Sequence, residues 1–342
     1  MSKKLKTALI RVESNFLIGS GHAMRMLALT EMISSKFNLY VASRELSKNL
    51  INAFELKGVK YIPLREISQD NELMHLVAQI REVDLFIIDG YEELDNFKSQ
   101  CLDTKKKVLL VQDEKAIKFE ADMILNHCPV IEKKFPKKYS NRMCFGLEYS
   151  ILQDCFLREA RNQIHYPKKR NGIFINLGGS DPENLTSEIL QVVLEETEEN
   201  ILCVLGPMNK NEDSIKDRFK GYFHRLEIFH DLTSFQIKDL LISAELGICP
   251  SSTIALEAIA CRLPLVIGWS VKNQVEIYKG LTELGLAKGI GNIETGLKEL
   301  SEIVNEFISN QSLKNDIINL QSQHLDGKSS DRIKESIDLL FT

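Results

Sequence analysis

Several features are scarce or missing in this chain, and each absence excludes a class of protein. Its 342 residues include seven cysteines, an odd number that contains no Cys-x-x-Cys pair. This usage argues for reduced thiols and against a disulfide framework or a zinc knuckle. No run approaches the roughly 18 apolar residues that a membrane helix needs. The start, MSKKLKTALIRVESN, has too short an apolar stretch for a secretory signal.

An excess of positive charge is also missing. Lysine and arginine total 43 against 48 aspartates and glutamates, which gives a net charge of −5. A mildly acidic chain has no general attraction for nucleic acid or for anionic membranes, so a phosphate site must be built locally. We therefore expect a cytoplasmic protein, a monomer or weak dimer, that binds neither nucleic acid nor membrane.

The residues that are present predict a large α/β protein. Hydrophobic residues make up 44% and charged residues 27% of the chain, and 342 residues correspond to about two domains. Short apolar runs alternate with amphipathic segments such as 24–37, the pattern of a parallel sheet covered by helices. The expected strands are 7–12, 39–43, 61–63, 85–89 and 108–112 in the first half, and 172–177, 201–205, 226–229, 246–249 and 265–268 in the second.

The domain boundary is expected in a region rich in lysine, arginine and proline, residues 128–171. We place an N-terminal Rossmann-like domain at 1–163 and a C-terminal Rossmann-like domain at 164–342. Beyond residue 293 we expect two or three polar amphipathic helices, of which 329–342 could pack back on the first domain.

The loop after the first strand carries the first candidate site. Gly19 and Gly21 precede a helix that is expected to begin near Ala23, with His22 at its N-terminus and Arg25 one turn in, and Arg11 and Glu13 lie at the end of the strand. A dinucleotide site would need a third glycine, where Met24 stands, and an acidic residue after strand two, where Ser43 and Arg44 stand. The loop therefore does not predict nicotinamide binding.

His22 is a candidate general base. A helix N-terminus disfavours a proton on imidazole, and a neutral histidine in a cleft can accept a proton from water. The nearby charged residues support a site, because ligands of open α/β sheets bind at the carboxyl ends of strands. The alternatives are a histidine that caps the helix, and a plain ion pair between Arg11 and Glu13.

The second half carries a candidate nucleotide pocket built from turns and helix N-termini. Glycines and hydroxyls before a helix form an anion-binding turn, and a carboxylate one helical turn further can accept both hydroxyls of a ribose. A tight turn with Asp181 as helix N-cap is the alternative for the first motif. The candidate residues are Gly178, Gly179, Ser180, Asp181 and Gly206, then Ser251, Ser252, Thr253 and Glu257, and finally Asn273 and Gln274 for a sugar or base edge.

These motifs together resemble a known family over residues 5–290. The stretches are IGSGHAMR at 18–25, DGY at 89–91, FGLEYSIL at 145–152, NLGGSDPENLT at 176–186, PSSTIALEAIACRLP at 250–264 and NQ at 273–274. They are similar to the UDP-sugar hydrolases of pseudaminic acid biosynthesis, which are relatives of the glycosyltransferase that makes lipid II. The chain departs from the family pattern at Glu13, Gly90, Gln153 and the Pro250–Ser251 pair.

The resemblance implies a GT-B fold, with two Rossmann-like domains facing a central cleft. It also implies hydrolysis of UDP-2,4-diacetamido-2,4,6-trideoxy-β-L-altropyranose to the free sugar and UDP. His22 would be the general base, Asp89 and Tyr91 would lie near the sugar, and Glu257 would bind the uridine ribose. We expect no cofactor and no metal. The rival hypotheses are a GT-B glycosyltransferase with a UDP-sugar donor, and a catalytically silent protein that binds nucleotide sugars.

Overall fold

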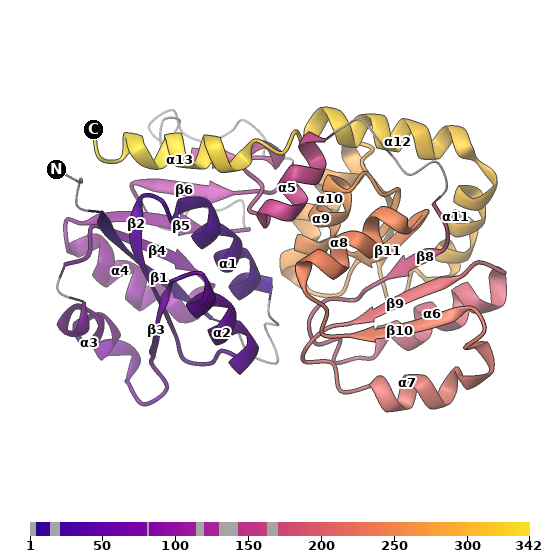
Figure 1. The fold of residues 1–342 in the computed structure, drawn as a ribbon, viewed down its shortest axis with the longest axis horizontal. Coiled ribbons are helices and arrows are strands. Elements are labelled where there is room, and N and C mark those ends of the chain that lie inside the picture. Colours follow the sequence, from indigo (N-terminus) through magenta and orange to yellow (C-terminus); the bar gives the residue numbers. More distant parts are fainter. Residues whose placement is uncertain (1–4, 14–20, 81, 114–119, 130–142, 163–169) are drawn as a thin grey trace. The chain divides into compact units, whose positions relative to one another are not determined.

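The computed structural model describes residues 5–13, 21–80, 82–113, 120–129, 143–162 and 170–342. They form two compact units, one made of residues 1–154 and 328–342 and the other of residues 155–327 (Figure 1). Each unit has its own parallel sheet with helices packed against both faces.

The sheet of the first unit has seven strands in the order β3-β2-β1-β4-β5-β6-β7. Helices α3 and α4 pack on one face over an apolar cluster that includes Leu9, Phe86 and Phe97. Helix α1 packs against α2 and α13. The strands are β1 (Lys6–Val12), β2 (Phe37–Ser43), β3 (Lys60–Pro63), β4 (Leu85–Asp89), β5 (Lys107–Val111), β6 (Met123–Asn126) and β7 (Met143–Phe145), and the helices are α1 (Gly21–Ile33), α2 (Lys48–Leu56), α3 (Glu72–Gln79), α4 (Asp95–Asp103) and α13 (Ser329–Leu339).

The sheet of the second unit has six strands in the order β10-β9-β8-β11-β12-β13. Its core packs α6, α7, α11 and α12 against these strands through buried aliphatic and phenylalanine side chains. The strands are β8 (Ile173–Ile175), β9 (Ile201–Leu205), β10 (Leu226–His230), β11 (Leu246–Pro250), β12 (Leu265–Trp269) and β13 (Lys288–Asn292). The helices are α5 (Asp154–Arg161), α6 (Leu185–Glu196), α7 (Glu212–Arg218), α8 (Ser234–Ser243), α9 (Thr253–Ala260), α10 (Val275–Glu283), α11 (Leu297–Ser309) and α12 (Gln311–His324).

All ten expected strands are present, with ends within two residues of those expected. The expected helix at 24–37 is α1, which begins three residues earlier and ends at Ile33, because Phe37 already opens β2. Three strands were not expected, namely β6, β7 and β13. The region 128–171 is not a plain linker, since it contains β7 and α5.

The last helix belongs with the first unit rather than with the second. Helix α13 packs against α1 and against a short 3-10 turn at Leu147–Tyr149. The Phe341 ring, just beyond α13, lies 6.0 Å from the Phe37 ring, and Ile333 and Ile337 of α13 are fully buried. The boundary expected between residues 163 and 164 lies outside the described residues, and the two units divide after Asp154 and again after Gly327.

Candidate active site

A buried polar cluster lies at the carboxyl end of the first sheet. His22 and Arg25 come from the first turns of α1, Asp89 ends β4, and Tyr91 follows in the next turn. His22 Nδ1 lies 2.6 Å from Asp89 Oδ1, and His22 Nε2 lies 3.0 Å from the Tyr91 hydroxyl. The structure thus brings together four predicted site residues, at the edge of a parallel sheet where ligands bind.

The charges in this cluster are balanced by Arg25. Its Nε donates to Asp89 Oδ2 at 2.6 Å, and its NH1 donates to Asp113 Oδ1. Burial alone would raise the pKa of Asp89, but the adjacent Arg25 and His22 hold it well below its usual range. Burial alone would lower the pKa of Arg25, but the carboxylates of Asp113 and Asp89 hold it well above its usual value. Both groups are therefore ionised at neutral pH.

The ionised Asp89 fixes the tautomer of a neutral His22. A carboxylate without a proton can only accept a hydrogen bond, so the hydrogen of the ring lies on Nδ1 and the lone pair on Nε2. Arg25 NH2, 3.1 Å from His22 Nδ1, is itself a donor and bonds to Asp89 instead. His22 Nε2 is consequently the basic atom of the ring, oriented by a carboxylate as in hydrolytic triads.

The turn that carries Tyr91 is held by α4. Lys98, a buried side chain of that helix, donates from Nζ to the carbonyl oxygens of Gly90 and Tyr91 at 2.9 and 2.8 Å. A Cβ added to Gly90 would lie 2.5 Å from Leu94 Cδ1. A larger residue at position 90 would therefore require the Leu94 side chain to move.

Two members of the cluster were not among the predicted site residues. Asp113 follows β5, and its Oδ2 lies 3.4 Å from the Tyr91 hydroxyl. His127 follows β6, and its Nε2 lies 3.7 Å from Asp113 Oδ1. Among the described residues neither ring nitrogen of His127 has a hydrogen-bond partner, and burial lowers the pKa of His127 to about 4. The position of these residues could have indicated them, because each lies within two residues of the end of a strand. However, β6 was not expected.

The described side-chain hydrogen bonds of Arg11 and Glu13 join them to Glu72 and to each other, not to the His22 cluster. Side chains alternate along β1, and Arg11 follows Leu9 onto the face covered by α3 and α4. Its guanidinium donates to Glu72 Oε2 at 2.8 Å and to Glu13. The buried ion pair that was the alternative is therefore present. Gly21 opens α1, where a Cβ would meet no atom within 4 Å, and Gly19 lies outside the described residues.

In the second unit, the glycine turns after β8 and β9 lie against each other. A Cβ added to Gly206 would lie 2.3 Å from the Gly178 carbonyl oxygen and 2.5 Å from Gly179 Cα. Gly178 has a φ of 86°, which favours glycine. These residues are needed for close backbone packing. Ser180, buried in the same turn, follows them directly.

The Asp181 carboxylate binds the first N–H groups of α6, although the N-cap position that the alternative hypothesis gave to Asp181 is occupied by Asn184. Its carboxylate accepts hydrogen bonds from the backbone N–H groups of Leu185 and Thr186 at 2.9 and 3.0 Å, and from the Thr186 hydroxyl. These two N–H groups are therefore not available to a phosphate. The carboxylate would also repel an anion, so the predicted ligand role of Asp181 is not supported by its contacts.

Helix α9 has the more open N-terminus. Ser251 is fully buried, and its hydroxyl lies 3.0 Å from the carbonyl oxygens of both Gly268 and Gln274, so it holds the loop rather than facing a ligand. Ser252 stands at the N-cap position without a capping hydrogen bond from its side chain, and Thr253 opens the helix. Ser252 thus leaves the first N–H groups of α9 without a cap from its own side chain, as anion-binding helix N-termini require.

Glu257 lies one turn further along α9, buried to 9% exposure. No described side chain forms a hydrogen bond or an ion pair with its carboxyl group, and burial raises its pKa to about 8. A buried carboxyl group without partners is costly, and two ligand hydroxyls would satisfy it.

Asn273 and Gln274 lie in a short 3-10 turn after β12. The Gln274 side chain is engaged within this turn, since its Oε1 accepts from the Ser270 N–H at 2.9 Å. A ligand contact through this oxygen would compete with that bond. Both residues follow a strand, as the sequence predicted.

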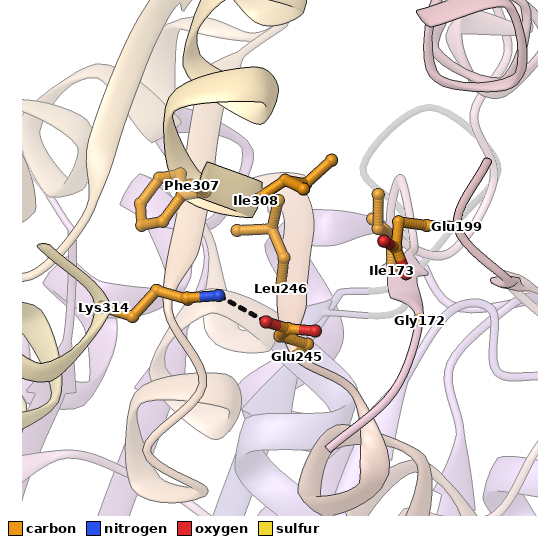
Figure 2. A pocket seen from close by; sticks show the side chains of 8 residues that line it. All are labelled: Gly172, Ile173, Glu199, Glu245, Leu246, Phe307, Ile308 and Lys314. Atoms are coloured by element: carbon orange, nitrogen blue, oxygen red, sulfur yellow. Dashed lines mark hydrogen bonds and ion pairs between the residues drawn. The ribbon is translucent and has the colours of Figure 1, made fainter. Parts of the chain in front are cut away.

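A surface hollow of the second unit lies away from these residues (Figure 2). It measures about 230 Å³, is open to solvent, and is lined at the amino ends of β8 and β11 by Gly172, Ile173 and Leu246. Lys314 and Glu245 form an ion pair there. Since the candidate nucleotide residues follow the carboxyl ends of the strands, this hollow is not their site.

The described residues contain neither a cluster of metal-ligating side chains nor a membrane-spanning helix. Within them, no group of three or more histidine, cysteine, aspartate or glutamate side chains is arranged to hold a metal ion. In the same part of the chain, no helix combines the length and apolar character needed to cross a membrane.

Comparisons with known proteins relate this chain to sugar-biosynthesis proteins at low identity. No protein-family model matches it. It is 26% identical over 289 residues to the uncharacterized protein MJ1062 of Methanocaldococcus jannaschii, covering 80% of this chain and 57% of that protein. It is 22% identical over 305 residues to the spore coat polysaccharide biosynthesis protein SpsG of Bacillus subtilis, covering 84% and 86%. The chain thus spans little more than half of the archaeal relative.

Solved structures confirm the expected fold class. Acinetobacter baumannii MurG matches with a TM-score of 0.66 and 14% identity over 98% of this chain and 99% of that one. Staphylococcus aureus MnaA with UDP matches with a TM-score of 0.67 and 17% identity over 97% of this chain and 96% of that one. Anabaena HepE with UDP and glucose matches with a TM-score of 0.63 and 12% identity over 97% of this chain and 99% of that one. The chain has the GT-B fold, with two α/β units built on parallel sheets.

Proposed function

We propose that this protein hydrolyses a UDP-linked sugar to the free sugar and UDP, with His22 as the general base. The observation that carries the proposal is the pair of His22 and Asp89, with Nδ1 and Oδ1 2.6 Å apart and Nε2 directed away from the carboxylate. This arrangement fits a base that takes a proton from water. The resemblance of the sequence motifs favours a diacetamido-trideoxy sugar as the substrate.

The chemistry divides between the two units. His22 Nε2 takes a proton from water as the water oxygen bonds to C1 of the sugar, and the bond from C1 to the diphosphate oxygen breaks. The resulting imidazolium is stabilised by Asp89, which remains ionised. UDP is a good leaving group, so one base suffices where ordinary glycosidases need two carboxylates.

The second unit would bind the departing UDP. The uncapped N-terminus of α9, with Ser252 and Thr253, can accept the diphosphate, because backbone N–H groups and the helix dipole favour negative charge. Glu257 can accept the two hydroxyls of the ribose. Names of the similar proteins support this reading, since MnaA and HepE were solved with UDP.

The test is an NMR time course of the protein with a panel of UDP-diacetamido sugars and no acceptor. We expect free sugar and UDP to accumulate together. His22→Asn should lower turnover roughly 100-fold or more while leaving UDP affinity unchanged. His224→Asn, at an exposed histidine of the second unit, is the matched control and should turn over like wild type. Near-wild-type turnover of His22→Asn would exclude the general-base role.

The same experiment separates the rival functions. A glycosyltransferase, the activity named for MurG and for the calicheamicin enzyme CalG4, would release free sugar poorly until an acceptor is added. An epimerase, the activity named for the Listeria monocytogenes neighbour, would produce an altered UDP-sugar. A silent binding protein would bind the UDP-sugar in calorimetry and leave it intact.

A further inference from the structure

The Tyr91 hydroxyl covers the basic nitrogen of His22. Asp89 binds the Nδ1 hydrogen, so Nε2 carries the one lone pair of the neutral ring. The Tyr91 oxygen lies 3.0 Å from Nε2, which is a hydrogen-bond distance and leaves no space for a water molecule between the two atoms. A water that attacks the sugar therefore cannot bind Nε2 while Tyr91 keeps this position.

The Tyr91 hydroxyl is suited to carry a proton across this contact. A phenol can donate its one hydrogen and accept another at the same time. Its nearest described acceptor is His22 Nε2, since Asp113 Oδ2 lies farther away at 3.4 Å. His22 is buried, with 6% of its surface exposed, whereas Tyr91 is partly exposed. Of the two rings, Tyr91 is therefore the one that solvent can approach.

A buried ammonium group fixes the turn that carries Tyr91. Lys98 is 8% exposed, and its Nζ donates to the carbonyl oxygens of Gly90 and Tyr91 at 2.9 and 2.8 Å and to Asp95 Oδ1 at 3.3 Å. An ammonium has three hydrogens, so it can make all three bonds at once. Hydrogen bonds from a charged donor are stronger than those between neutral groups. A shift of the turn would break these bonds, so Lys98 fixes the backbone from which the Tyr91 ring reaches His22.

We propose that the Tyr91 hydroxyl relays the proton of the attacking water to His22, and that Lys98 is the positioning residue that holds it in line. This rests on the proposed function and specifies its proton path. The water oxygen bonds to C1 as the bond from C1 to the diphosphate oxygen breaks, and the electron pair of that bond leaves with UDP. A water proton moves to the Tyr91 oxygen while the Tyr91 hydrogen moves to Nε2. His22 ends as an imidazolium, and Tyr91 is a neutral phenol before and after the step.

A proton inventory tests the relay. The rate of a single turnover, with enzyme in excess so that product release does not contribute, is measured in mixtures of light and heavy water. Because two protons move in the relay, the wild-type rate should fall along a bowl-shaped curve as the fraction of heavy water rises. Tyr91→Phe removes the carrier and should lower the rate roughly 10- to 100-fold. A straight line for wild type, or a Tyr91→Phe rate within about twofold of wild type, would show that water reaches Nε2 directly and would overturn the relay.

A double-mutant cycle tests the role of Lys98. Lys98→Met should lower the single-turnover rate about tenfold in the wild-type background and less than about twofold in the Tyr91→Phe background, because Lys98 acts through the hydroxyl. Lys106→Met, at an exposed position after α4, is the control and should react like wild type. An equal loss in both backgrounds would show that Lys98 only supports the fold and would overturn its positioning role. Circular dichroism reports the folding of each variant, and Lys98→Gln, which can still donate two of the bonds, replaces Lys98→Met if that variant unfolds.

Failure of the proposed function has a different signature. Wild-type protein that releases no sugar from any UDP-sugar of the panel would overturn that function, and the relay with it. Release of sugar by wild type with a linear proton inventory would overturn the relay alone.

Discussion

Replacing Glu257 by glutamine should change how the stability of the second unit depends on pH. The carboxyl group is buried on α9 without a described side-chain partner, and its pKa is about 8 instead of the ordinary 4.5. Glutamine fills nearly the same volume and cannot ionise. The substitution therefore removes one titration from the unit and leaves its packing almost unchanged.

The sign of the effect follows from the raised pKa. The folded unit holds the Glu257 proton more tightly than the unfolded chain does. The stabilisation is therefore fully present below the unfolded pKa and is lost as the pH rises through the folded pKa of about 8. At 1.36 kcal/mol per tenfold change in proton binding, roughly 2 to 3 kcal/mol of unfolding free energy is lost between pH 6 and pH 9. The glutamine variant loses none of this.

The assay is urea unfolding followed by tryptophan fluorescence. The chain has one tryptophan, Trp269 at the end of β12, so the signal reports the unit that contains Glu257. Wild type, Glu257→Gln and the control Glu299→Gln, an exposed position on α11, are compared at pH 6 and pH 9. The wild-type free energy of unfolding should fall relative to Glu257→Gln, and the control should follow wild type. A constant difference between wild type and Glu257→Gln at both pH values would refute the reasoning.

Three other predictions concern the two candidate sites. Uridine binding at pH 7 should release close to one proton in wild type and none in Glu257→Gln, because ribose hydroxyls favour the ionised carboxylate. Calorimetry in two buffers of different ionisation enthalpy measures the number of protons released. Equal release in both proteins would contradict the prediction. Asp89→Asn should lower kcat by a factor of about 10³ to 10⁴ with UDP affinity intact, because the carboxylate that orients the histidine base is lost. A loss under tenfold would argue against a catalytic pair of His22 and Asp89. Gly206→Ala should destabilise the second unit by about 1 to 3 kcal/mol in the same urea assay, because its Cβ would overlap Gly178 and Gly179, and an unchanged midpoint would contradict that steric account.

Central strands with long apolar runs could be predicted from the sequence, whereas the short β6, which reads Met-Ile-Leu-Asn, and the polar β13 were not expected. β4 reads Leu-Phe-Ile-Ile-Asp and is fully buried, which is typical of a central parallel strand. β13 reads Lys-Gly-Ile-Gly-Asn, and its two glycines indicate a loop. Its Gly289 is accounted for by packing, because a Cβ there would lie 2.3 Å from the Tyr278 hydroxyl oxygen. That contact depends on where α10 lies, which the local sequence does not reveal.

Site residues that belong to one sequence motif could be predicted. Site residues that are brought together only by the order of strands in the sheet could not. His22 and Arg25 share a helical turn, and Asp89 and Tyr91 share a strand end. Asp113 joins them because β4 pairs with β5. The contacts of Arg11 depend on the same kind of information, since its position at the end of β1 was recognised but the face to which its side chain points was not.

The return of α13 to the first unit makes the polypeptide pass between the two units twice. The contacts that hold this segment include the ion pair of Lys36 with Asp338 and the Lys6 ammonium 4.5 Å above the Phe341 ring. No single cut of the chain therefore yields both units intact. A fragment ending at Asp154 would leave the surfaces that receive Ile333 and Ile337 bare, whereas residues 155–327 are contiguous. The second unit could thus be produced as one continuous piece, whereas the unit that contains His22 would require its two segments to be joined.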